Sequence, residues 1–288
     1  MKSTAKASFK ILMSMVIFGT LAPFVRRIGV SSAELALYRA AMAAALVGIF
    51  LLGKGKAGSL RVPPRELLRL ILSGVAMGFN WILLFEAYRY TTVSVATLSY
   101  YFAPVIVTAL CPVLFREKLG KKQILCFVMS TVGLILITVS GNMTGGGKDL
   151  IGIGFGLGAA VLYASVVLLN KSIRTVQGLQ RTFLQFVAAV PVLLIYVCLT
   201  SGFSLGSLDA IGWGSLLIVG LVHTGLAYML YFGALPHVPG QKAAILSYVD
   251  PLVAVLISVT VLQEPMLPLQ IVGGILILGF TAWNELSQ

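Results

Sequence analysis

Charged side chains are scarce in this sequence. Only 10% of its 288 residues are Asp, Glu, Lys or Arg, whereas 58% are hydrophobic and the mean hydropathy is +0.99. An ordinary globular chain is about 25% charged. One protein core of this size could not hide so many apolar residues, but a lipid bilayer can solvate them. We therefore expect an all-α polytopic membrane protein rather than a soluble one.

Cysteine and histidine are also rare. The cysteines Cys111, Cys126 and Cys198 lie inside apolar runs without a CxxC spacing, and the two histidines are His223 and His237. This pattern supports neither a disulfide framework nor a zinc site, so we expect buried packing cysteines, no metal and no other cofactor. No HExxH, GxSxG, paired-aspartate or ATP-binding motif is present, which argues against an enzyme and against ATP-driven transport.

The formal charge of +12 is distributed in short clusters between apolar runs. A nucleic-acid-binding surface would instead need one continuous basic stripe. The clusters indicate membrane topology, so the expected partners are the lipid bilayer and a small-molecule substrate, without nucleic acid.

Ten apolar runs are long enough to cross a membrane, given about 20 residues per span. The first run has no cleavage pattern of a signal peptide and is expected to be retained. The ten predicted spans are residues 9–25, 34–53, 68–88, 94–115, 121–140, 150–170, 179–200, 209–234, 241–262 and 267–284.

Lysine and arginine are unevenly distributed between the two sides of this predicted topology. With the N-terminus inside, sixteen of them fall in inside segments and four in outside segments, and Arg39 is left within a span. Cytoplasmic loops are the basic ones. We therefore expect cytoplasmic N- and C-termini, in a multi-pass protein of the inner (cytoplasmic) membrane.

The sequence repeats itself at a constant spacing of 147 residues. The matched pairs include Phe85 with Phe232, Ala87 with Ala234, Tyr101 with Tyr248, Pro104 with Pro251, Glu117 with Glu264 and Gln123 with Gln270. The two prolines mark predicted spans four and nine, and these are five spans apart. Five is odd, so the second copy must have inverted topology, which is a feature of secondary transporters. The predicted domains are the five-helix repeats 1–140 and 141–288.

The repeated pattern also resembles a known family. Ala87, Ala96, Leu98, Pro104, the run 116–119, Gln123 and Gly133 recur from Ala234 to Gly279 in a manner similar to the EamA family of the drug/metabolite transporter superfamily. This resemblance implies ten helices, a central cavity lined mainly by spans one to four and six to nine, and peripheral spans five and ten. It implies transport of amino acids, other metabolites or drugs, commonly outward. One difference between the copies is Asp250 before Pro251, where the first copy has Ala103.

Aromatic residues are the first candidates for the substrate site. Proline in the middle of a span frees a backbone carbonyl, which is tolerable only beside protein or a cavity. Tyr101 and Tyr248 precede the two prolines by three residues and share their helix faces. We expect both tyrosines in the cavity, with a packed aromatic at a kink as the alternative. Further expected lining residues are Phe18, Tyr38, Trp81, Tyr100, Tyr163 and Tyr228.

Polar residues inside spans are the second group of candidates. The repeat places Asn80 and His223 toward one shared space, and an unpaired polar group facing lipid costs several kcal/mol. Both are expected in the cavity, where they either contact substrate or bridge helices.

Charges inside spans are the most informative, because an unpaired charge there is expensive. Asp250 is a candidate for proton coupling or for binding a cationic group, with a carboxylate that bonds freed backbone groups as the alternative. Arg39 could receive a substrate carboxylate or pair with Glu34 or Glu86. Glu264, at a span end, is expected to be a cap and topology determinant.

The sequence therefore predicts a secondary carrier, monomeric or homodimeric, whose halves rock around a central aromatic and polar cavity. The expected substrate is an amino acid, aromatic ones included, exported by alternating access. An alternative is an organic amine, quaternary ammonium compound or drug, held by an aromatic cage with Asp250 as counter-charge. More remote alternatives are an intramembrane enzyme or a channel.

Overall fold

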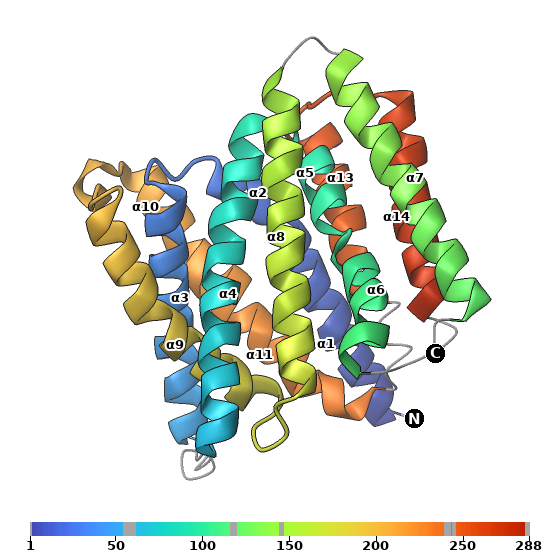
Figure 1. Cartoon of the computed structure of the whole chain (residues 1–288). Helices are drawn as coiled ribbons and strands as arrows, with labels where there is room; N and C mark the ends of the chain where they lie inside the picture. Colours follow the sequence, from blue (N-terminus) through green and yellow to red (C-terminus); the bar gives the residue numbers. More distant parts are fainter. Residues whose placement is uncertain are drawn as a thin grey trace.

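The computed structural model describes residues 2–53, 62–115, 120–143, 147–238, 243 and 246–285, and within these all regular structure is helical (Figure 1). The first half contains α1 (Lys2–Gly19), α2 (Leu21–Val25), α3 (Ser32–Gly53), α4 (Pro64–Tyr90), α5 (Val93–Tyr100), α6 (Ala103–Phe115) and α7 (Lys121–Met143). The second half contains α8 (Gly147–Lys171), α9 (Gly178–Leu199), η2 (Leu205–Ser207), α10 (Ala210–Leu217), η3 (Ile218–Leu226), α11 (Ala227–Ala234), η4 (Leu235–His237), α13 (Val249–Thr260) and α14 (Pro268–Glu285).

Polar side chains before the apolar runs fix where helices begin. The Ser31 hydroxyl accepts a hydrogen bond from the Glu34 N–H at 3.0 Å at the start of α3. The Asp209 carboxylate accepts one from the Gly212 N–H at 2.7 Å at the start of α10. These bonds satisfy amide groups that the first helical turn leaves without intrahelical acceptors.

Eight helical segments are long and apolar enough to cross a membrane, judged by length and composition in the described residues. Two further apolar helices, Val249–Thr260 and Pro268–Trp283, are shorter. The ten segments occupy the positions predicted from the sequence. The all-α polytopic class is confirmed, and the count of ten crossings stays a prediction.

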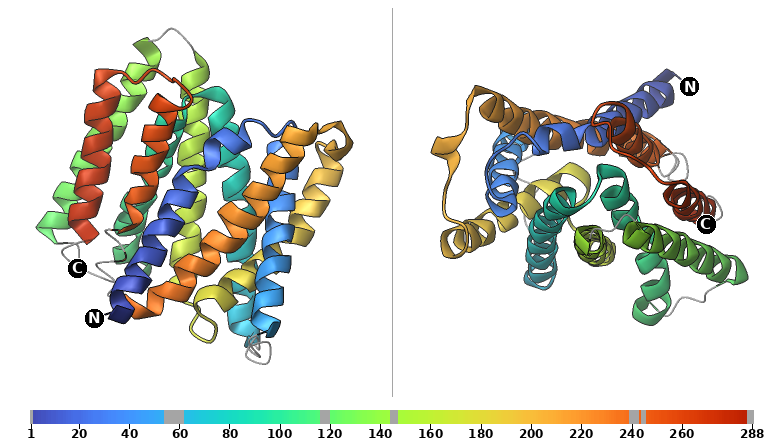
Figure 2. Two further views of the ribbon diagram at one scale, coloured as in Figure 1. Left: turned by 180° about the vertical axis from the view of Figure 1, so that it is seen from behind. Right: turned by 90° about the horizontal axis from the view of Figure 1, so that it is seen from above.

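The main contacts between the two halves are symmetric: each of these contacts of a first-half helix with a second-half helix has an equivalent in which the two halves change roles. Helix α4 lies along α8, and the equivalent α11 lies along α1. Helix α1 contacts α13, just as α8 contacts α5 and α6, while α3 packs on α9 and α7 on α14. Figure 2 shows this arrangement from behind and along the helices. Such a pairing is expected for two repeats related by a pseudo-twofold axis.

Spans four and nine, each predicted as one continuous helix with a proline in its middle, are interrupted beside that proline. Tyr101 and Phe102 form a turn between α5 and α6, and Tyr248 forms a turn immediately before α13. The two turns are 147 residues apart, and Pro104 and Pro251 follow each tyrosine by three residues. Proline has no N–H to continue the helical hydrogen bonding, so the sequence explains why both helices are interrupted here.

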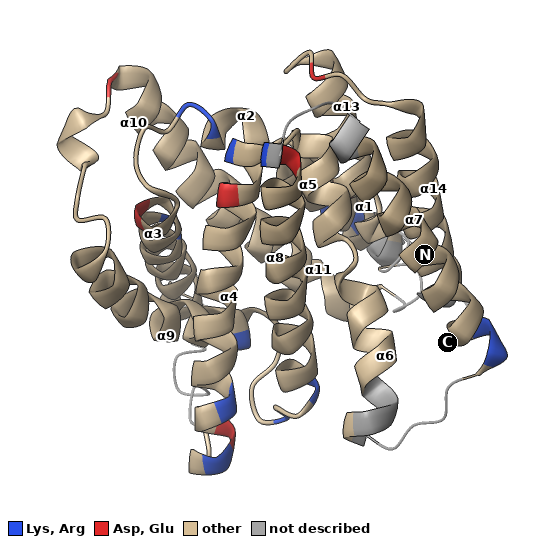
Figure 3. Ribbon diagram, turned by 45° about the horizontal axis from the view of Figure 1, so that its top comes forward, with Lys and Arg blue, Asp and Glu red and all other residues tan. Residues whose placement is uncertain are grey.

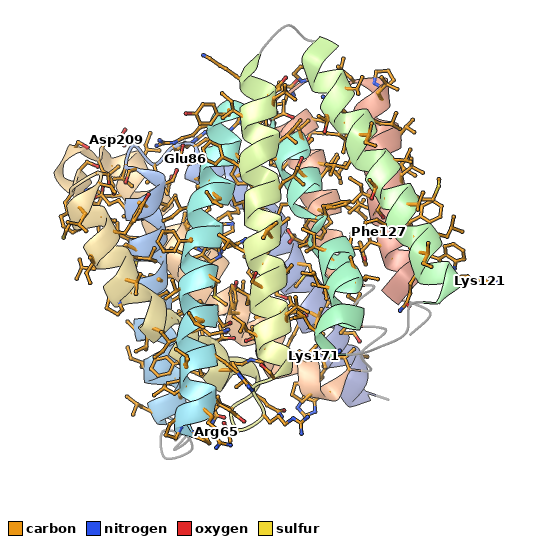
Figure 4. All side chains as sticks on the ribbon, in the orientation of Figure 1. Arg65, Glu86, Lys121, Phe127, Lys171 and Asp209 are labelled. Carbon is orange, nitrogen blue, oxygen red and sulfur yellow. The ribbon has the colours of Figure 1, made fainter. Side chains whose placement is uncertain are left out.

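The N- and C-termini lie at the same end of the molecule, which we call the terminal end (Figure 1). Arg65 and Lys171 also lie there, while Glu86 and Asp209 lie at the opposite end (Figure 4). Charged residues gather toward these two ends, and much of the ribbon between them carries neither sign of charge (Figure 3). Termini on one side are consistent with an even number of crossings. Which side faces the cytoplasm stays a prediction.

Helices α7 and α14 form a separate pair at one edge of the molecule (Figure 1). Their backbones approach closely, because a Cβ atom added at Gly273 would lie 2.5 Å from the carbonyl oxygen of Gly133. Small residues permit such close packing between membrane helices, where van der Waals contact provides much of the attraction.

Candidate substrate cavity

A cavity of about 540 Å³ lies between the two halves. Its lining comes from α1 to α6 of the first half and from α8, α11, η4 and α13 of the second. Helices α7 and α14 contribute no lining residue among those described, in agreement with the peripheral position that the family resemblance implied. A cavity shared by two repeats near the middle of the bundle is the usual location of a carrier's substrate site.

The structure brings together nine of the twelve residues that the sequence singled out. The nine that line the cavity are Phe18, Arg39, Trp81, Tyr100, Tyr101, Tyr163, Tyr228, Tyr248 and Asp250. The lining found here does not include the other three, Tyr38, Asn80 and His223.

Aromatic rings from both halves surround the cavity. Tyr100 lies against Tyr101, with ring centroids 5.8 Å apart, and against Tyr163 of the second half at 5.5 Å. Phe18 packs edge-on against Tyr228 at 5.3 Å. These distances and angles are typical of favourable aromatic pairs. The rings give the cavity an apolar lining that also carries polar hydroxyl groups.

Asp250 joins the two interrupted helices. The hydroxyl of Tyr101, in the turn between α5 and α6, donates a hydrogen bond of 2.7 Å to the Asp250 carboxylate in the first turn of α13. A carboxylate is also favoured at a helix N-terminus by the helix dipole. The repeat has Ala103 at the equivalent position. The cavity is therefore chemically asymmetric although its scaffold is nearly symmetric.

Arg39 supplies a positive charge to the same cavity. The residue is only 3% exposed, and its Nε donates to the Thr224 hydroxyl at 2.7 Å. The centre of its guanidinium lies 4.3 Å from the centroid of the Trp81 ring, within range of a cation–π interaction.

The ion pair considered for Arg39 is not present. Glu34 instead accepts hydrogen bonds from Tyr38 at 2.9 Å and from the Ser204 N–H at 2.9 Å. Glu86 pairs with Arg89 at 3.6 Å. Both carboxylates are occupied close to their own helix end, and this explains why neither reaches Arg39.

Three expected site residues serve other contacts. Asn80 donates a hydrogen bond of 2.6 Å to the Ala159 carbonyl and so joins α4 to α8. His223 lies within 3.2 Å of the Thr20 hydroxyl, and Tyr38 donates to Glu34. A hydrogen bond to a neighbouring helix removes the cost of an unpaired polar group as well as a polar cavity does. The sequence therefore could not distinguish a position between helices from a position in the cavity.

Several lining residues were missed by the sequence analysis. They are Thr97, Thr108, Tyr88, Tyr231 and Phe232. Helical spacing offered a signal for two of them: Tyr88 follows Trp81 by seven residues, and Tyr231 follows Tyr228 by three. Both spacings return a side chain to the same helix face.

The end of the molecule opposite the termini is held together by a charged network. Glu264, in the loop between α13 and α14, forms an ion pair with Arg26 and accepts a hydrogen bond of 2.8 Å from the Val93 N–H at the start of α5. Arg26 in turn donates to the carbonyls of Tyr88 and Thr91 at 3.2 and 3.3 Å. Glu264 is thus a helix cap, as predicted, but the capped helix belongs to the other half. Its repeat counterpart Glu117 lies outside the described residues.

A second cavity of about 600 Å³ surrounds this network. Arg26, Glu264 and Asp149 are among its lining residues, and Tyr88 lines both this cavity and the central one. Tyr88 therefore separates the central cavity from the opposite end of the molecule. In the described ranges, no group of three His, Cys, Asp or Glu residues is placed to hold a metal ion.

The fold and the cavity define a polytopic membrane protein in which two related helical halves enclose a central site. Residues 5–139 and 150–284 each match the EamA-like transporter family, and the chain belongs to this family, as its sequence resemblance to this branch of the drug/metabolite transporters predicted.

Similar proteins agree with this assignment. The chain is 29% identical to the uncharacterized transporter YxxF of Bacillus subtilis (strain 168), over 89% of this chain and 82% of that protein. It is 30% identical to an uncharacterized transporter of Archaeoglobus fulgidus, over 96% of this chain and 95% of that protein. A solved crystal structure that is 16% identical matches with a TM-score of 0.68 over 96% of both chains, which shows a shared fold.

Proposed function

We propose that this transporter is a secondary carrier that moves an amino acid, aromatic ones included, out of the cell across the inner (cytoplasmic) membrane. The observation that carries the proposal is one cavity, built from both halves, that combines Arg39, Asp250 and a lining of aromatic rings. Its volume of about 540 Å³ is within the range of small-molecule sites. A small amphipathic solute with charged and apolar parts matches these groups.

Alternating access is the proposed mechanism. Helix α4 runs from the terminal end to the opposite end, and α8 runs back, so the cavity extends from Tyr88 toward Val167 and Leu235 near the terminal end. At the opposite end the Arg26–Glu264 network and Tyr88 lie between the cavity and the surface. We infer that this conformation opens its site toward the terminal end, which is the cytoplasmic side in the predicted topology. Rocking of the pseudosymmetric halves would release the substrate on the other side.

An organic amine, quaternary ammonium compound or drug is the second candidate substrate. The contact between Tyr101 and Asp250, within a group of tyrosine rings, favours it. Aromatic faces attract organic cations, and the carboxylate would neutralise their charge.

Ligand-dependent thermal unfolding of the purified protein in detergent tests the function. A ligand that binds only the folded state raises the unfolding temperature according to the ratio of its concentration to its Kd. We expect at least one of the twenty L-amino acids to do so, and Tyr101→Ala to abolish the rise. Liposomes that contain the unmodified protein should take up that amino acid, whereas liposomes that contain Tyr101→Ala should not. A rise in unfolding temperature with amines alone would show that the substrate is an amine rather than an amino acid. No rise with any amino acid, amine or drug would contradict the proposal.

A further inference from the structure

Arg39 has an unusual environment for a cation inside a membrane protein. It is 3% exposed and lines the cavity, yet within the described part of the chain its one recorded hydrogen bond is from Nε to Thr224 and no carboxylate forms an ion pair with it. A guanidinium has five N–H donors. Most of its donor capacity is therefore not used by the protein.

A buried charge of this kind is expensive unless something pairs with it. Trp81 and Phe85 offset only part of the cost, through cation–π contacts in which the central guanidinium carbon lies 4.3 Å and 5.5 Å from their ring centroids. Neither ring offers an oxygen acceptor, and the recorded hydrogen bond uses Nε, so the N–H groups at the outer edge of the guanidinium are available to a ligand. That edge is the part of arginine that binds a carboxylate through two parallel hydrogen bonds.

An acidic side chain, Asp250, lines the same cavity without forming an ion pair with Arg39. Asp250 receives its hydrogen bond from Tyr101, and neither Asp250 nor Arg39 takes part in an ion pair with another described residue. The cavity thus keeps a cation and an anion apart, each held by an uncharged partner. A solute that carries both charges would satisfy both residues at once.

We infer that Arg39 is the specificity-determining residue that binds the carboxylate of the substrate, with Asp250 receiving its ammonium group. The substrate class is therefore zwitterionic α-amino acids, and amines without a carboxylate are excluded. This inference rests on the proposed function, because it assigns roles within the same cavity. It narrows that function by removing the amine alternative.

Thr224 positions the guanidinium. It lies in η3, a stretch of π-helix, where its hydroxyl donates to the Val219 carbonyl at 2.8 Å and accepts from Arg39 Nε. The hydroxyl hydrogen and the hydroxyl oxygen each have a partner, so the orientation of this group is fixed. A π-helical segment inside a longer helix is frequent at functional sites.

Three matched ligands test the inference on the unmodified protein. They are the L-amino acid with the largest stabilising effect, its carboxamide, which lacks the carboxylate, and its deamino acid, which lacks the ammonium group. We expect the carboxamide to bind 10- to 100-fold more weakly than the amino acid, as for loss of a charged hydrogen-bonded pair. Equal binding of the carboxamide would overturn the role of Arg39 while leaving transport intact. Equal stabilisation by inorganic phosphate would show a general oxyanion site and would also overturn it.

Variants supply an independent measurement. Arg39→Gln should bind the amino acid and its carboxamide equally, whereas Arg39→Lys should recover part of the preference because it keeps the charge. Thr224→Val should weaken binding of the amino acid more than binding of the carboxamide, because it removes the hydroxyl acceptor that orients the guanidinium. Arg69→Gln is the matched control, since Arg69 is exposed and donates to the Ser172 carbonyl away from the cavity. An unchanged preference in a folded Arg39→Gln protein would refute the inference.

Discussion

Tyr101 and Asp250 show how a single residue pair makes the cavity asymmetric. Replacing Tyr101 by Phe keeps the ring but removes the donor of the 2.7 Å hydrogen bond. We expect this variant to bind the amino acid roughly three- to tenfold more weakly, because the carboxylate loses the contact that orients it. Isothermal titration in detergent measures the change. Tyr196→Phe is the control, since Tyr196 packs on Phe79 at 5.2 Å and is not part of the lining. An equal loss in both variants would contradict this role.

Asn80 provides the opposite prediction at the residue scale. Its 2.6 Å hydrogen bond to the Ala159 carbonyl links α4 to α8 and lies outside the cavity lining. Asn80→Ala should lower the unfolding temperature by roughly 2–4 °C, the effect of about 1 kcal/mol from one hydrogen bond between membrane helices. Ligand affinity should not change. Thermal unfolding with and without ligand separates the two quantities, and a selective loss of affinity would return Asn80 to the substrate site.

The residue scale also marks the limit of sequence reasoning about the site. Aromatic residues beside the prolines and the charges within spans led to the cavity lining, because few other locations tolerate them. Asn80 and His223 did not, because a backbone carbonyl or a threonine hydroxyl satisfies them equally well. A sequence shows that a polar group needs a partner, but the partner is chosen by tertiary packing.

At the scale of elements, composition was sufficient for most of the fold. Apolar runs predicted the position of each long helix, and the matched prolines marked the two places, at Tyr101 and Tyr248, where the structure interrupts spans four and nine. The short α2, which continues α1 after Thr20, and the π-helical η3 were not predicted. In both places the backbone hydrogen-bonding pattern of the helix changes inside one apolar run. Hydropathy is the same whichever pattern the backbone adopts, so it could not predict these changes.

Gly273 tests the close packing between α7 and α14. A Cβ atom added there would lie 2.5 Å from the Gly133 carbonyl oxygen and 2.8 Å from Ile137 Cγ1. Gly273→Ala must therefore separate the helices, at a cost of about 1–3 kcal/mol. We expect a lower unfolding temperature with unchanged ligand affinity, measured by thermal unfolding. Gly279→Ala on the same helix is the control, since its added Cβ would meet no atom within 4 Å. Equal effects at both positions would refute the packing argument.

For the whole molecule, the Arg26–Glu264 ion pair is the contact that should hold the opposite end closed. It joins the loop before α14 to α2 and to the start of α5, and the Glu264 side chain is only 10% exposed. Glu264→Gln removes the charge but keeps the shape. Since about 1.4 kcal/mol changes a conformational equilibrium tenfold, loss of this contact should substantially raise the population open at this end.

Labelling of one cavity cysteine measures that population. In a protein whose native cysteines are replaced, Thr97→Cys places a thiol in the cavity lining on α5. A membrane-impermeant maleimide added outside intact cells should label it roughly tenfold faster when Glu264→Gln is also present, as the expected population shift requires. Glu86→Gln is the matched control, because it removes a carboxylate at the same end whose partner is its helical neighbour Arg89. Faster labelling only from the cytoplasmic side would reverse the predicted topology. No change from either side would show that the ion pair does not hold this end closed, so that closure would have to depend on the packing around Tyr88 instead.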